Sequence, residues 1–545
     1  MLRKLVFAVL IVAVGSITLL AVRGRGQTVE RRAYSRPKLV IVIVIDQFRY
    51  DYLVRFRPEF VTGGFTRLLN GGANFINCRY DDASTVTCAG HAALFSGAYP
   101  DLNGIIANNW YDPVLHRSVY CATDLGTKLV GGSDVQASVP AGASPKNLMG
   151  TTLGDEMRMA SDFKSKVVAI SLKDRSAVMP GGHTANAAYW YDAGSGHFVS
   201  STYYMPKLPA WVKTFNQHPP VASYCGKDWK ALPENPIASG EVFKRFTPNQ
   251  AERCPDTRFL NWLHQTPYMT ALELDFAEDA IRNDHLGAGP ATDLLAISIS
   301  ENDVIGHAYG PYSAQVADVT LWTDRYLAQF FQMVDQTVGL NNVWIVLSAD
   351  HGVAPNPDFI VKHRLGQGSV DLADLHREVE RALDARFGQD HWIESEDEFY
   401  LYLSRDAMAR HHVSAEAVEA AAASAASQVD GVRAAFTRAQ LMSSQVPPTA
   451  LARKVLHSFN PQRSGDVFLV LDPFSVAVPP GIRTTHGTPW SYDAQVPLIF
   501  WGNAFTPGIY WTPAQPVDLA ATVAAALGIT QPSDEEGEPL SAAIR

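Results

Sequence analysis

Four continuous apolar runs constrain the fold of this chain more than any other feature of its sequence. They span residues 38–45, 166–172, 293–300 and 342–349. Runs that stay apolar without alternation are typical of parallel strands that helices cover on both faces. The predicted fold class is therefore α/β, with a mostly parallel central sheet flanked by helices and with inserted cap subdomains. A length of 545 residues is more than a domain with a single hydrophobic core usually contains, which agrees with such insertions.

Polar side chains follow each run at the point where the strand would end. In chain order they are Asp46, then Lys173 and Arg175, then Asp303, and then Asp350 and His351. Open α/β sheets bind their ligands in the crevice beyond the carboxyl ends of the strands. These side chains are therefore expected along one edge of one sheet.

Two further histidines extend this set toward a metal site. His307 lies four residues after Asp303, and His486 lies late in the chain. Asp and His hold catalytic zinc, whereas structural zinc sites depend on cysteine, and the sequence has no Cys-x-x-Cys pair. A turn or cap role would explain any one of these residues alone. The joint pattern predicts a catalytic metal site.

A hydroxyl-rich segment precedes a helix-like stretch at residues 89–95. It contains Ser84, Thr85 and Thr87. A helix N-terminus offers unpaired backbone N–H groups and partial positive charge to an anion, so one of these hydroxyls could act as a nucleophile there. Plain capping of the helix by Ser or Thr would explain the same residues.

Taken together, the motifs resemble the alkaline phosphatase superfamily. They are, in order, Asp46, Thr87 with Cys88-Ala89-Gly90-His91, Asn108, Lys173-Asp174-Arg175, Asp303 with Gly306-His307, Asp350-His351-Gly352 and Thr485-His486-Gly487. Within the superfamily they are most similar to the threonine-nucleophile, phosphate-irrepressible alkaline phosphatases, which are related to the nucleotide pyrophosphatase/phosphodiesterases. The resemblance covers roughly residues 38–545.

The resemblance implies a role for each matched residue. Thr87 would be the nucleophile, and Asn108, Lys173 and Arg175 would contact the phosphoryl oxygens. Two Zn²⁺ ions would be bound, by two sets of ligands. One set is Asp303, His307 and His486, and the other is Asp46, Asp350, His351 and the Thr87 oxygen.

Four nearby residues have no such role in the resemblance. His91 matches a family position and is interpreted as structural. Ser84 stands where relatives often have Pro, and Cys88 where several have Ala or Phe, so altered packing is expected rather than lost activity. Thr85 remains a weaker rival to Thr87 as the nucleophile.

The reaction implied is hydrolysis of phosphate monoesters through a covalent phosphothreonine. A monoester carries about one more negative charge than a diester, and the two cations Lys173 and Arg175 favour it. A phosphodiesterase or nucleotide pyrophosphatase on the same site is the alternative, and a non-catalytic metal-binding surface protein is a third reading. A sulfatase would need a C-x-P-x-R motif, but Cys88 is followed by Ala-Gly-His-Ala.

The amino end resembles a targeting segment. Arg3 and Lys4 precede an apolar stretch of 18 residues at 5–22. This is longer than an ordinary signal-peptide core and at the short limit for a membrane span. Residues 1–22 are therefore predicted to be a signal peptide or an N-terminal membrane anchor, which would place the rest in the periplasm or outside the cell. A linker at 23–37 and a catalytic domain at 38–545 would follow, with insertions at about 189–286 and about 359–462.

Cysteines and charge add two expectations. Among the five cysteines, Cys225 with Cys254 is the favoured disulfide and Cys78 with Cys121 the weaker one, with reduced buried thiols as the alternative for both. Lys and Arg number 45 against 55 Asp and Glu, giving a net charge of −10 without a basic block. No nucleic-acid-binding surface is expected, and the sequence carries no signal for an oligomeric state.

Overall fold

The computed structural model describes residues 34–132, 142–218, 223–246, 257–397 and 399–545. The predicted signal peptide or anchor at 1–22 and most of the linker at 23–37 lie outside these described residues. Ser35–Ile544 form one compact unit. Within the described part of the chain, no helix combines the length and the apolar composition that a membrane crossing requires.

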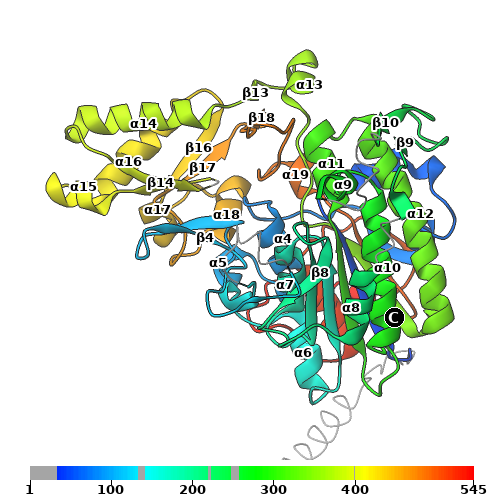
Figure 1. Ribbon diagram of the computed structural model, residues 1–545. Coiled ribbons are helices and arrows are strands. Elements are labelled where there is room, and N and C mark those ends of the chain that lie inside the picture. The colour runs from blue at the N-terminus through cyan, green and yellow to red at the C-terminus, as the bar shows by residue number, and fades with distance from the viewer. Residues whose placement is uncertain (1–33, 133–141, 219–222, 247–256, 398) are drawn as a thin grey trace, which may run out of the picture. The chain divides into compact units, whose positions relative to one another are not determined.

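A ten-stranded sheet forms the centre of this unit (Figure 1). In spatial order its strands are β20 (Gly508–Tyr510), β2 (Gly72–Phe75), β19 (Leu498–Trp501), β12 (Val343–Ser348), β1 (Leu39–Ile45), β11 (Asp293–Ile299), β6 (Val167–Ser171), β7 (Ala187–Asp192), β8 (His197–Ser201) and β5 (Leu129–Val130). The five strands from β12 to β7 are parallel neighbours, and antiparallel pairs lie on both sides of them. The predicted α/β class with a mostly parallel central sheet is confirmed.

The register of the parallel strands brings their carboxyl ends together. Ile45 of β1 pairs with Ile299 of β11, and Val44 pairs with Ser348 of β12. Ser171 of β6 in turn pairs with residue 298 of β11. Because these strands end side by side, the residues that follow them meet at one edge of the sheet.

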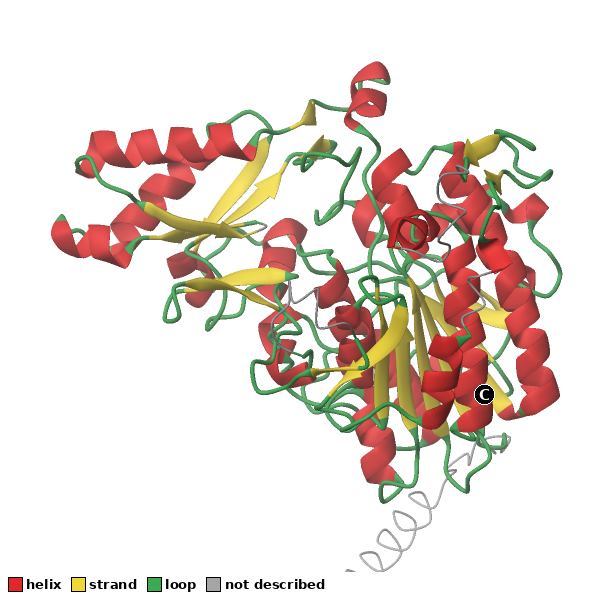
Figure 2. Cartoon of the chain, in the orientation of Figure 1, coloured by secondary structure: helices red, strands yellow, loops and turns green. Residues whose placement is uncertain are grey.

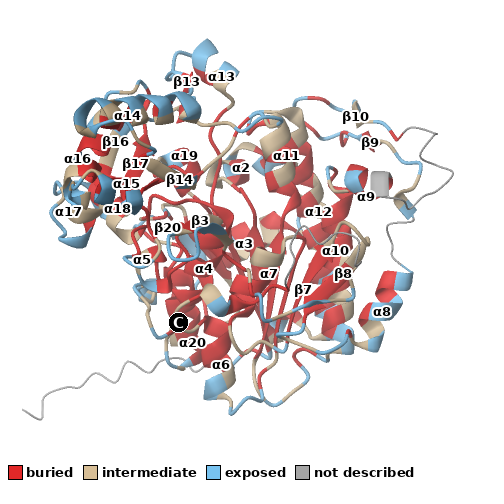
Figure 3. Cartoon of the chain, turned by 60° about the vertical axis from the view of Figure 1, so that its left-hand side comes forward, coloured by how far each residue is buried: buried red, intermediate tan, exposed pale blue. Residues whose placement is uncertain are grey.

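Helices flank the sheet in two groups (Figures 1 and 2). The first group comprises α4 (Thr87–Ser96), α6 (Leu153–Ala160), α7 (Asp174–Gly181) and α20 (Asp518–Leu527), which contact one another. The second comprises α8 (Ala210–Gln217), α10 (Tyr268–Asn283), α11 (Glu301–Tyr309) and α12 (Ala314–Thr337). With helices on both sides, the strands between them are buried throughout, and Figure 3 shows them red. This explains the unbroken apolar runs.

A smaller four-stranded sheet has a core of its own. Its strands are β14 (Ile393–Asp397), β15 (Tyr400–Leu403), β17 (Val467–Leu471) and β16 (Val432–Thr437), and they pack against α14 (Leu372–Phe387) and α16 (Ala415–Ala426). Most of this region falls within the segment 359–462. The segment 189–286, in contrast, includes β8 and most of β7, so part of it belongs to the central sheet. The division into domains stays a prediction.

The disulfides differ from the expected pattern. Cys88 is bonded to Cys121, and Cys78 is a buried free thiol. The predicted pairing of Cys78 with Cys121 is therefore wrong. The hairpin of β3 (Asn109–Asp112) and β4 (Arg117–Tyr120) ends just before Cys121 and lies beside the start of α4, whereas Cys78 forms an isolated β-bridge with Ala514. Cys225 takes part in a disulfide, while its predicted partner, residue 254, lies outside the described residues.

Candidate active site

The proposed nucleophile is the first residue of α4. Val86 precedes it in an extended conformation without a side-chain cap, and the helix begins at Thr87, two residues before the predicted stretch. The Thr87 hydroxyl oxygen lies 3.5 Å from Nε2 of His351. Thr87 therefore faces the edge where the central strands end.

The rival hydroxyls point elsewhere. Thr85 donates its hydroxyl hydrogen to the backbone carbonyl of Thr488 over 2.8 Å, inside the protein. Ser84 is fully buried, and its hydroxyl has no hydrogen-bond partner among the described residues. Of the three hydroxyls, Thr87 is thus the one in contact with a predicted metal ligand.

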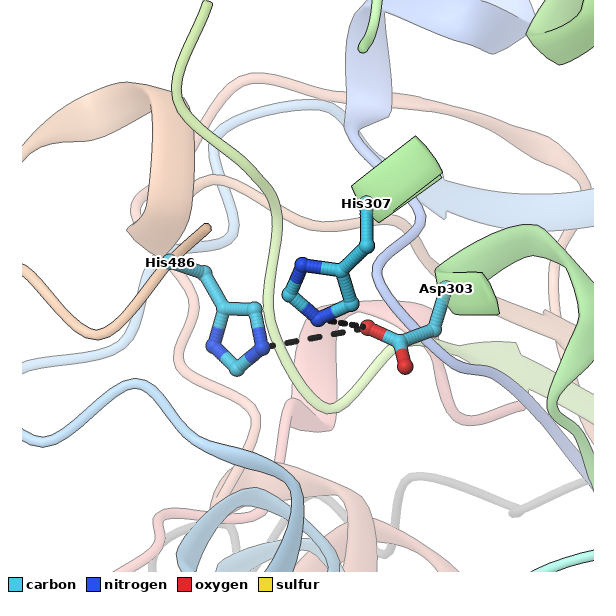
Figure 4. Close-up of side chains that lie close together, drawn as sticks. All are labelled: Asp303, His307 and His486. Atoms are coloured by element: carbon cyan, nitrogen blue, oxygen red, sulfur yellow. Dashed lines mark ion pairs between the residues drawn. The ribbon is translucent and has the colours of Figure 1, made fainter. Parts of the chain in front are cut away.

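The first predicted zinc site is assembled by one helix and one late loop (Figure 4). Asp303 and His307 lie one turn apart on α11, and Nε2 of His307 is 3.1 Å from the Asp303 Oδ1 oxygen. Nε2 of His486 approaches the same oxygen at 3.8 Å. One ligand atom from each residue lies within 4.8 Å of the others. The structure brings these three predicted ligands together.

The second group lies directly beside the first. Asp46, Asp303 and His351 bring their ligand atoms within 4.8 Å of one another, and Nε2 of His351 is 3.3 Å from Oδ1 of Asp46. Asp350 adjoins this group, with its Oδ2 oxygen 3.5 Å from the same nitrogen. Asp303 thus belongs to both groups, which the sequence analysis did not foresee.

Backbone carbonyls orient all three imidazoles in the same way. The Nδ1 atoms of His307, His351 and His486 lie 2.7, 2.9 and 2.9 Å from the carbonyl oxygens of Thr484, Gly352 and Thr85, respectively. A carbonyl only accepts, so each Nδ1 donates a hydrogen, and each Nε2 faces the carboxylates. This is the arrangement that holds a histidine ready to bind a metal through Nε2.

Buried carboxylate oxygens complete a set that fits metal ions. Asp46 and Asp350 are fully buried, and one oxygen of each has no hydrogen-bond partner within the described ranges. These two oxygens lie 3.3 and 3.2 Å from imidazole nitrogens of His351 and His91, respectively, and each retains lone pairs that a cation could use. Carboxylate oxygens and imidazole nitrogens in this mixture suit zinc.

Opposite charges set the ionisation of the second group. Burial and Asp303 raise the pKa of Asp46, but Lys173 and His351 outweigh them and hold it below its usual range. Burial lowers the pKa of His351, whereas Asp350 and Asp46 together raise it to about 9. Without a metal ion, His351 therefore carries a proton at neutral pH.

Burial and neighbouring charges also set the ionisation of the first group. Burial raises the pKa of Asp303, but His307 and Lys173 hold it well below its usual range. Burial, reinforced by His351 and His307, lowers the pKa of His486 well below its usual value. His486 is accordingly neutral, as a metal ligand must be.

Lys173 lies between the two groups. Its ammonium is 2.5 Å from Oδ2 of Asp46 and 2.6 Å from Oδ2 of Asp303. Burial lowers the pKa of this ammonium, but the two carboxylates raise it above its usual value. The cation predicted to contact phosphate therefore also neutralises two predicted metal ligands.

Arg175 approaches the site from the first turn of α7. Its Nη1 donates to the Tyr120 hydroxyl over 3.4 Å, and that hydroxyl donates to Asp174 over 2.5 Å. The buried Nε of Arg175 has no hydrogen-bond partner in the part of the chain that is described. Arg175 is thus held by a tyrosine and retains a donor for an anion.

Asn108 is fixed against α4, the helix that begins with Thr87. Its side-chain oxygen accepts the backbone N–H of Cys88 over 3.0 Å. His91, interpreted as structural, lies on the same helix, with Nδ1 2.8 Å from the Thr87 carbonyl oxygen and 3.2 Å from Oδ2 of Asp350. Its Nε2 lies 2.7 Å from the Ser298 hydroxyl. Both residues tie α4 to its surroundings.

Gln47 is a site residue that the sequence analysis missed. Its amide donates to Oδ1 of Asp303 over 2.7 Å, and its backbone N–H donates to Oδ1 of Asp350 over 3.1 Å. Its φ of 62° is uncommon for a residue other than glycine and is typical of functional sites. Its position directly after Asp46, at a strand end, was the only signal in the sequence.

Comparison with known proteins agrees with this geometry. Residues 40–487 match the family model described as type I phosphodiesterase / nucleotide pyrophosphatase. The alkaline phosphatase PafA of Elizabethkingia meningoseptica is 33% identical over 538 residues, which cover 96% of this chain and 98% of PafA. The crystal structure of PafA matches with a TM-score of 0.86 over 94% of this chain and all of that one. A PafA variant with one Thr, one Asn, one Lys and one Arg substituted matches equally well.

Two other relatives are similar over nearly the whole chain. The alkaline phosphatase PhoV of Synechococcus elongatus is 35% identical over 525 residues, covering 93% of each chain. A protein of Myroides odoratus named calcium-transporting ATPase is 35% identical over 529 residues, covering 93% of this chain and 95% of that one. The chain therefore belongs to the type I phosphodiesterase / nucleotide pyrophosphatase family and, with PafA and PhoV, is an alkaline phosphatase.

Proposed function

We propose that this alkaline phosphatase is an exported enzyme that holds two Zn²⁺ ions and hydrolyses phosphate monoesters through a covalent phosphothreonine at Thr87. The observation that carries the proposal is the common orientation of three imidazoles toward buried carboxylates. Asp303, His307 and His486 would hold one ion, and Asp46, Asp350, His351 and Thr87 the other. Bound there, the ions would supply Lewis acidity to the attacking and leaving oxygens.

Thr87 provides the attacking oxygen. Its hydroxyl oxygen forms a bond to phosphorus while the bond to the alcohol oxygen breaks, and the leaving alcohol takes up a proton. A water molecule then cleaves the phosphothreonine and releases inorganic phosphate, which restores the hydroxyl. Covalent catalysis of this kind divides one difficult displacement into two easier ones. The position of Thr87 as the first residue of α4 supports this role, because a helix N-terminus favours an anion.

Three donors would hold the phosphoryl oxygens during transfer. Asn108 faces the start of α4, and Lys173 and Arg175 follow β6 at the same sheet edge. Fixed donors aimed at developing charge usually contribute most to such a reaction. The substituted Thr and Asn of the PafA variant are 21 positions apart, as Thr87 and Asn108 are, and its substituted Lys and Arg are two apart, as here.

Export is supported by two features of the chain. The apolar segment at 5–22 follows Arg3 and Lys4, as in signal peptides and N-terminal anchors. The Cys88–Cys121 disulfide is typical of proteins that mature in an oxidising compartment. Export is tested by cell fractionation and by measuring whether protease added to intact cells can reach the protein. A protein found only in the cytosol would contradict export.

Preference for monoesters is tested with matched substrates. The experiment compares kcat/KM for an aryl phosphate monoester and a methyl aryl diester on purified enzyme with measured zinc content. We expect the monoester to be preferred, because Lys173 and Arg175 favour the additional charge. The family model is described by a diesterase activity, so phosphodiesterase is the second candidate. A higher kcat/KM for the diester would establish it instead.

A further inference from the structure

We propose that the Cys88–Cys121 disulfide is a positioning element of the active site, which holds the Asn108 amide in its working orientation. The inference rests on the proposed contact between Asn108 and a phosphoryl oxygen. Neither cysteine touches the reacting atoms, so both would act through Asn108.

Both halves of the disulfide bind Asn108 through their backbone. The N–H of Cys88 donates to the Asn108 side-chain oxygen over 3.0 Å, and the N–H of Cys121 donates to the Asn108 carbonyl oxygen over 2.9 Å. The bond between the two sulfur atoms joins these two donors covalently. The two disulfide-bonded cysteines therefore hold Asn108 at both its backbone and its side chain.

These two hydrogen bonds determine the orientation of the Asn108 side-chain amide. A buried backbone N–H requires an acceptor, so the oxygen of the Asn108 amide, rather than its nitrogen, must face Cys88. The amide hydrogens then point away from that N–H. Cys88 directly follows Thr87 in the first turn of α4, so the amide is oriented relative to the nucleophile itself.

The hairpin that follows Asn108 also contacts a different part of the protein. Asn108 directly precedes β3 (Asn109–Asp112), which pairs with β4 (Arg117–Tyr120), and β3 contacts β14 of the smaller sheet. From the same hairpin, Tyr111 donates its hydroxyl hydrogen to Glu394 over 2.7 Å. On the other side, the Tyr120 hydroxyl of β4 contacts Asp174 and Arg175 of α7. The disulfide adds a covalent attachment to α4, which would limit how far movement of the smaller sheet displaces Asn108.

The disulfide lies directly beside the proposed nucleophile. Both sulfur-bearing residues are fully buried, and one of them is the immediate neighbour of the nucleophile. A purely structural cross-link would reduce activity only through general loss of order. A cross-link that positions Asn108 would instead reduce activity only when Asn108 is present.

A double-mutant cycle tests this dependence. We would measure kcat/KM for an aryl phosphate with the wild type, Asn108→Ala, the pair Cys88→Ser and Cys121→Ser, and the combination of all three. Loss of the disulfide is expected to lower kcat/KM about tenfold or more when Asn108 is present, and less than about threefold in the Asn108→Ala background. The inhibition constant for inorganic phosphate should follow the same pattern.

Matched controls separate positioning from stability. Cys225→Ser removes a disulfide at another place in the chain, so it is expected to lower the thermal midpoint without an effect that depends on Asn108. Asn108→Asp keeps an acceptor for Cys88 but has no amide hydrogens, so it should lose about as much activity as Asn108→Ala. If the serine pair does not fold, the alanine pair, which buries no hydroxyl, replaces it in the cycle.

The outcomes are distinct. Equal fold losses with and without Asn108, or no loss from removing the disulfide, would overturn the positioning role. If Asn108→Ala and Thr87→Ala both left kcat/KM unchanged, the proposed function itself would be wrong. Zinc content and circular dichroism of each variant establish that folded, metal-loaded proteins are compared.

Discussion

Gly90 on α4 packs directly against the backbone carbonyl of Asp350, which follows the end of β12. A Cβ atom at this position would lie closer to that oxygen than real Cβ atoms ever approach. The helix that carries the proposed nucleophile and the strand end that carries two proposed metal ligands can therefore contact each other only because residue 90 has no side chain.

Gly90→Ala should separate these two elements. Alanine is normally preferred over glycine inside a helix by about 1 kcal/mol, yet here we expect the change to lower kcat/KM by roughly a hundredfold and to reduce zinc content. Gly181→Ala on α7 is the matched control, because its Cβ would meet only ordinary contacts at 3.5 Å. Zinc analysis and kinetics of both variants check the prediction, and wild-type behaviour of Gly90→Ala would refute it.

Thr87→Ala should abolish the covalent step. We expect kcat/KM to fall by roughly a thousandfold or more, since the neighbouring hydroxyls of Ser84 and Thr85 point elsewhere and cannot replace the lost nucleophile. Thr85→Ala loses only a hydrogen bond to the Thr488 carbonyl, a change of about 1 kcal/mol, and should keep activity within about tenfold. Mass spectrometry of acid-quenched enzyme should locate phosphate on Thr87. A larger effect from Thr85→Ala would reverse the assignment.

Removal of Lys173 and Arg175 should reduce monoester hydrolysis selectively. Charged hydrogen bonds are worth roughly 1.5–3 kcal/mol each, so the double alanine variant should lose about a hundredfold or more in kcat/KM for a monoester and far less for a diester. The two effects should not add, because both cations act on one phosphoryl group.

The two single variants should differ in zinc content. The Lys173 ammonium neutralises Asp46 and Asp303 and so competes with a metal ion for them, and Lys173→Ala should therefore bind zinc more tightly than the wild type while losing catalysis. Arg175 contacts the Tyr120 hydroxyl, so Arg175→Ala should retain zinc. Equal losses on both ester classes would show that the two cations only maintain the site.

Zinc should bind the metal-free enzyme more tightly as the pH rises. Burial lowers the pKa of His351, but Asp350 and Asp46 raise it to about 9, and this imidazole must lose its proton to bind a metal. Removing zinc with a chelator should abolish activity. Apparent zinc affinity on reloading should then increase by up to about tenfold per pH unit below pH 9, and level off above it.

Stability of the metal-free enzyme should change in the opposite direction. The pKa of His351 is higher in the folded state than its ordinary value of 6.5. The stability gained from this proton is fully present below pH 6.5 and is lost as the pH rises through about 9. Thermal unfolding of the chelated protein measures this, with His351→Asn as the control. Zinc affinity independent of pH from 7 to 9 would contradict both predictions.

The strand ends of the site could be predicted because burial on both faces leaves a simple sequence pattern. Asp46, Asp303 and Asp350 each follow an unbroken apolar run, and parallel pairing then fixes their common edge. His307 could be placed beside Asp303 because residues four apart share one face of a helix. Local rules sufficed for these residues.

Other features depend on distant contacts that no local pattern encodes. The pairing of Cys88 with Cys121 depends on where a hairpin lies relative to a helix, so the weaker of the two predicted disulfides was wrong. Gln47 contributes through a backbone conformation that its residue type does not suggest. The contact of Lys173 with both carboxylates arises only when three strands lie side by side.

The long sequence separations within the site also determine when it can form. Gln47 donates to Asp350 across 303 positions, and β1 cannot pair with β12 until both have been made. His486 is contributed later still, by the last part of the chain to enter the site. A growing polypeptide therefore has no complete ligand set until residue 486 has been synthesised and folded onto the sheet. Binding of the proposed metal ions would for this reason come late in maturation, after His486 has reached the carboxylates that β1, β11 and β12 bring together.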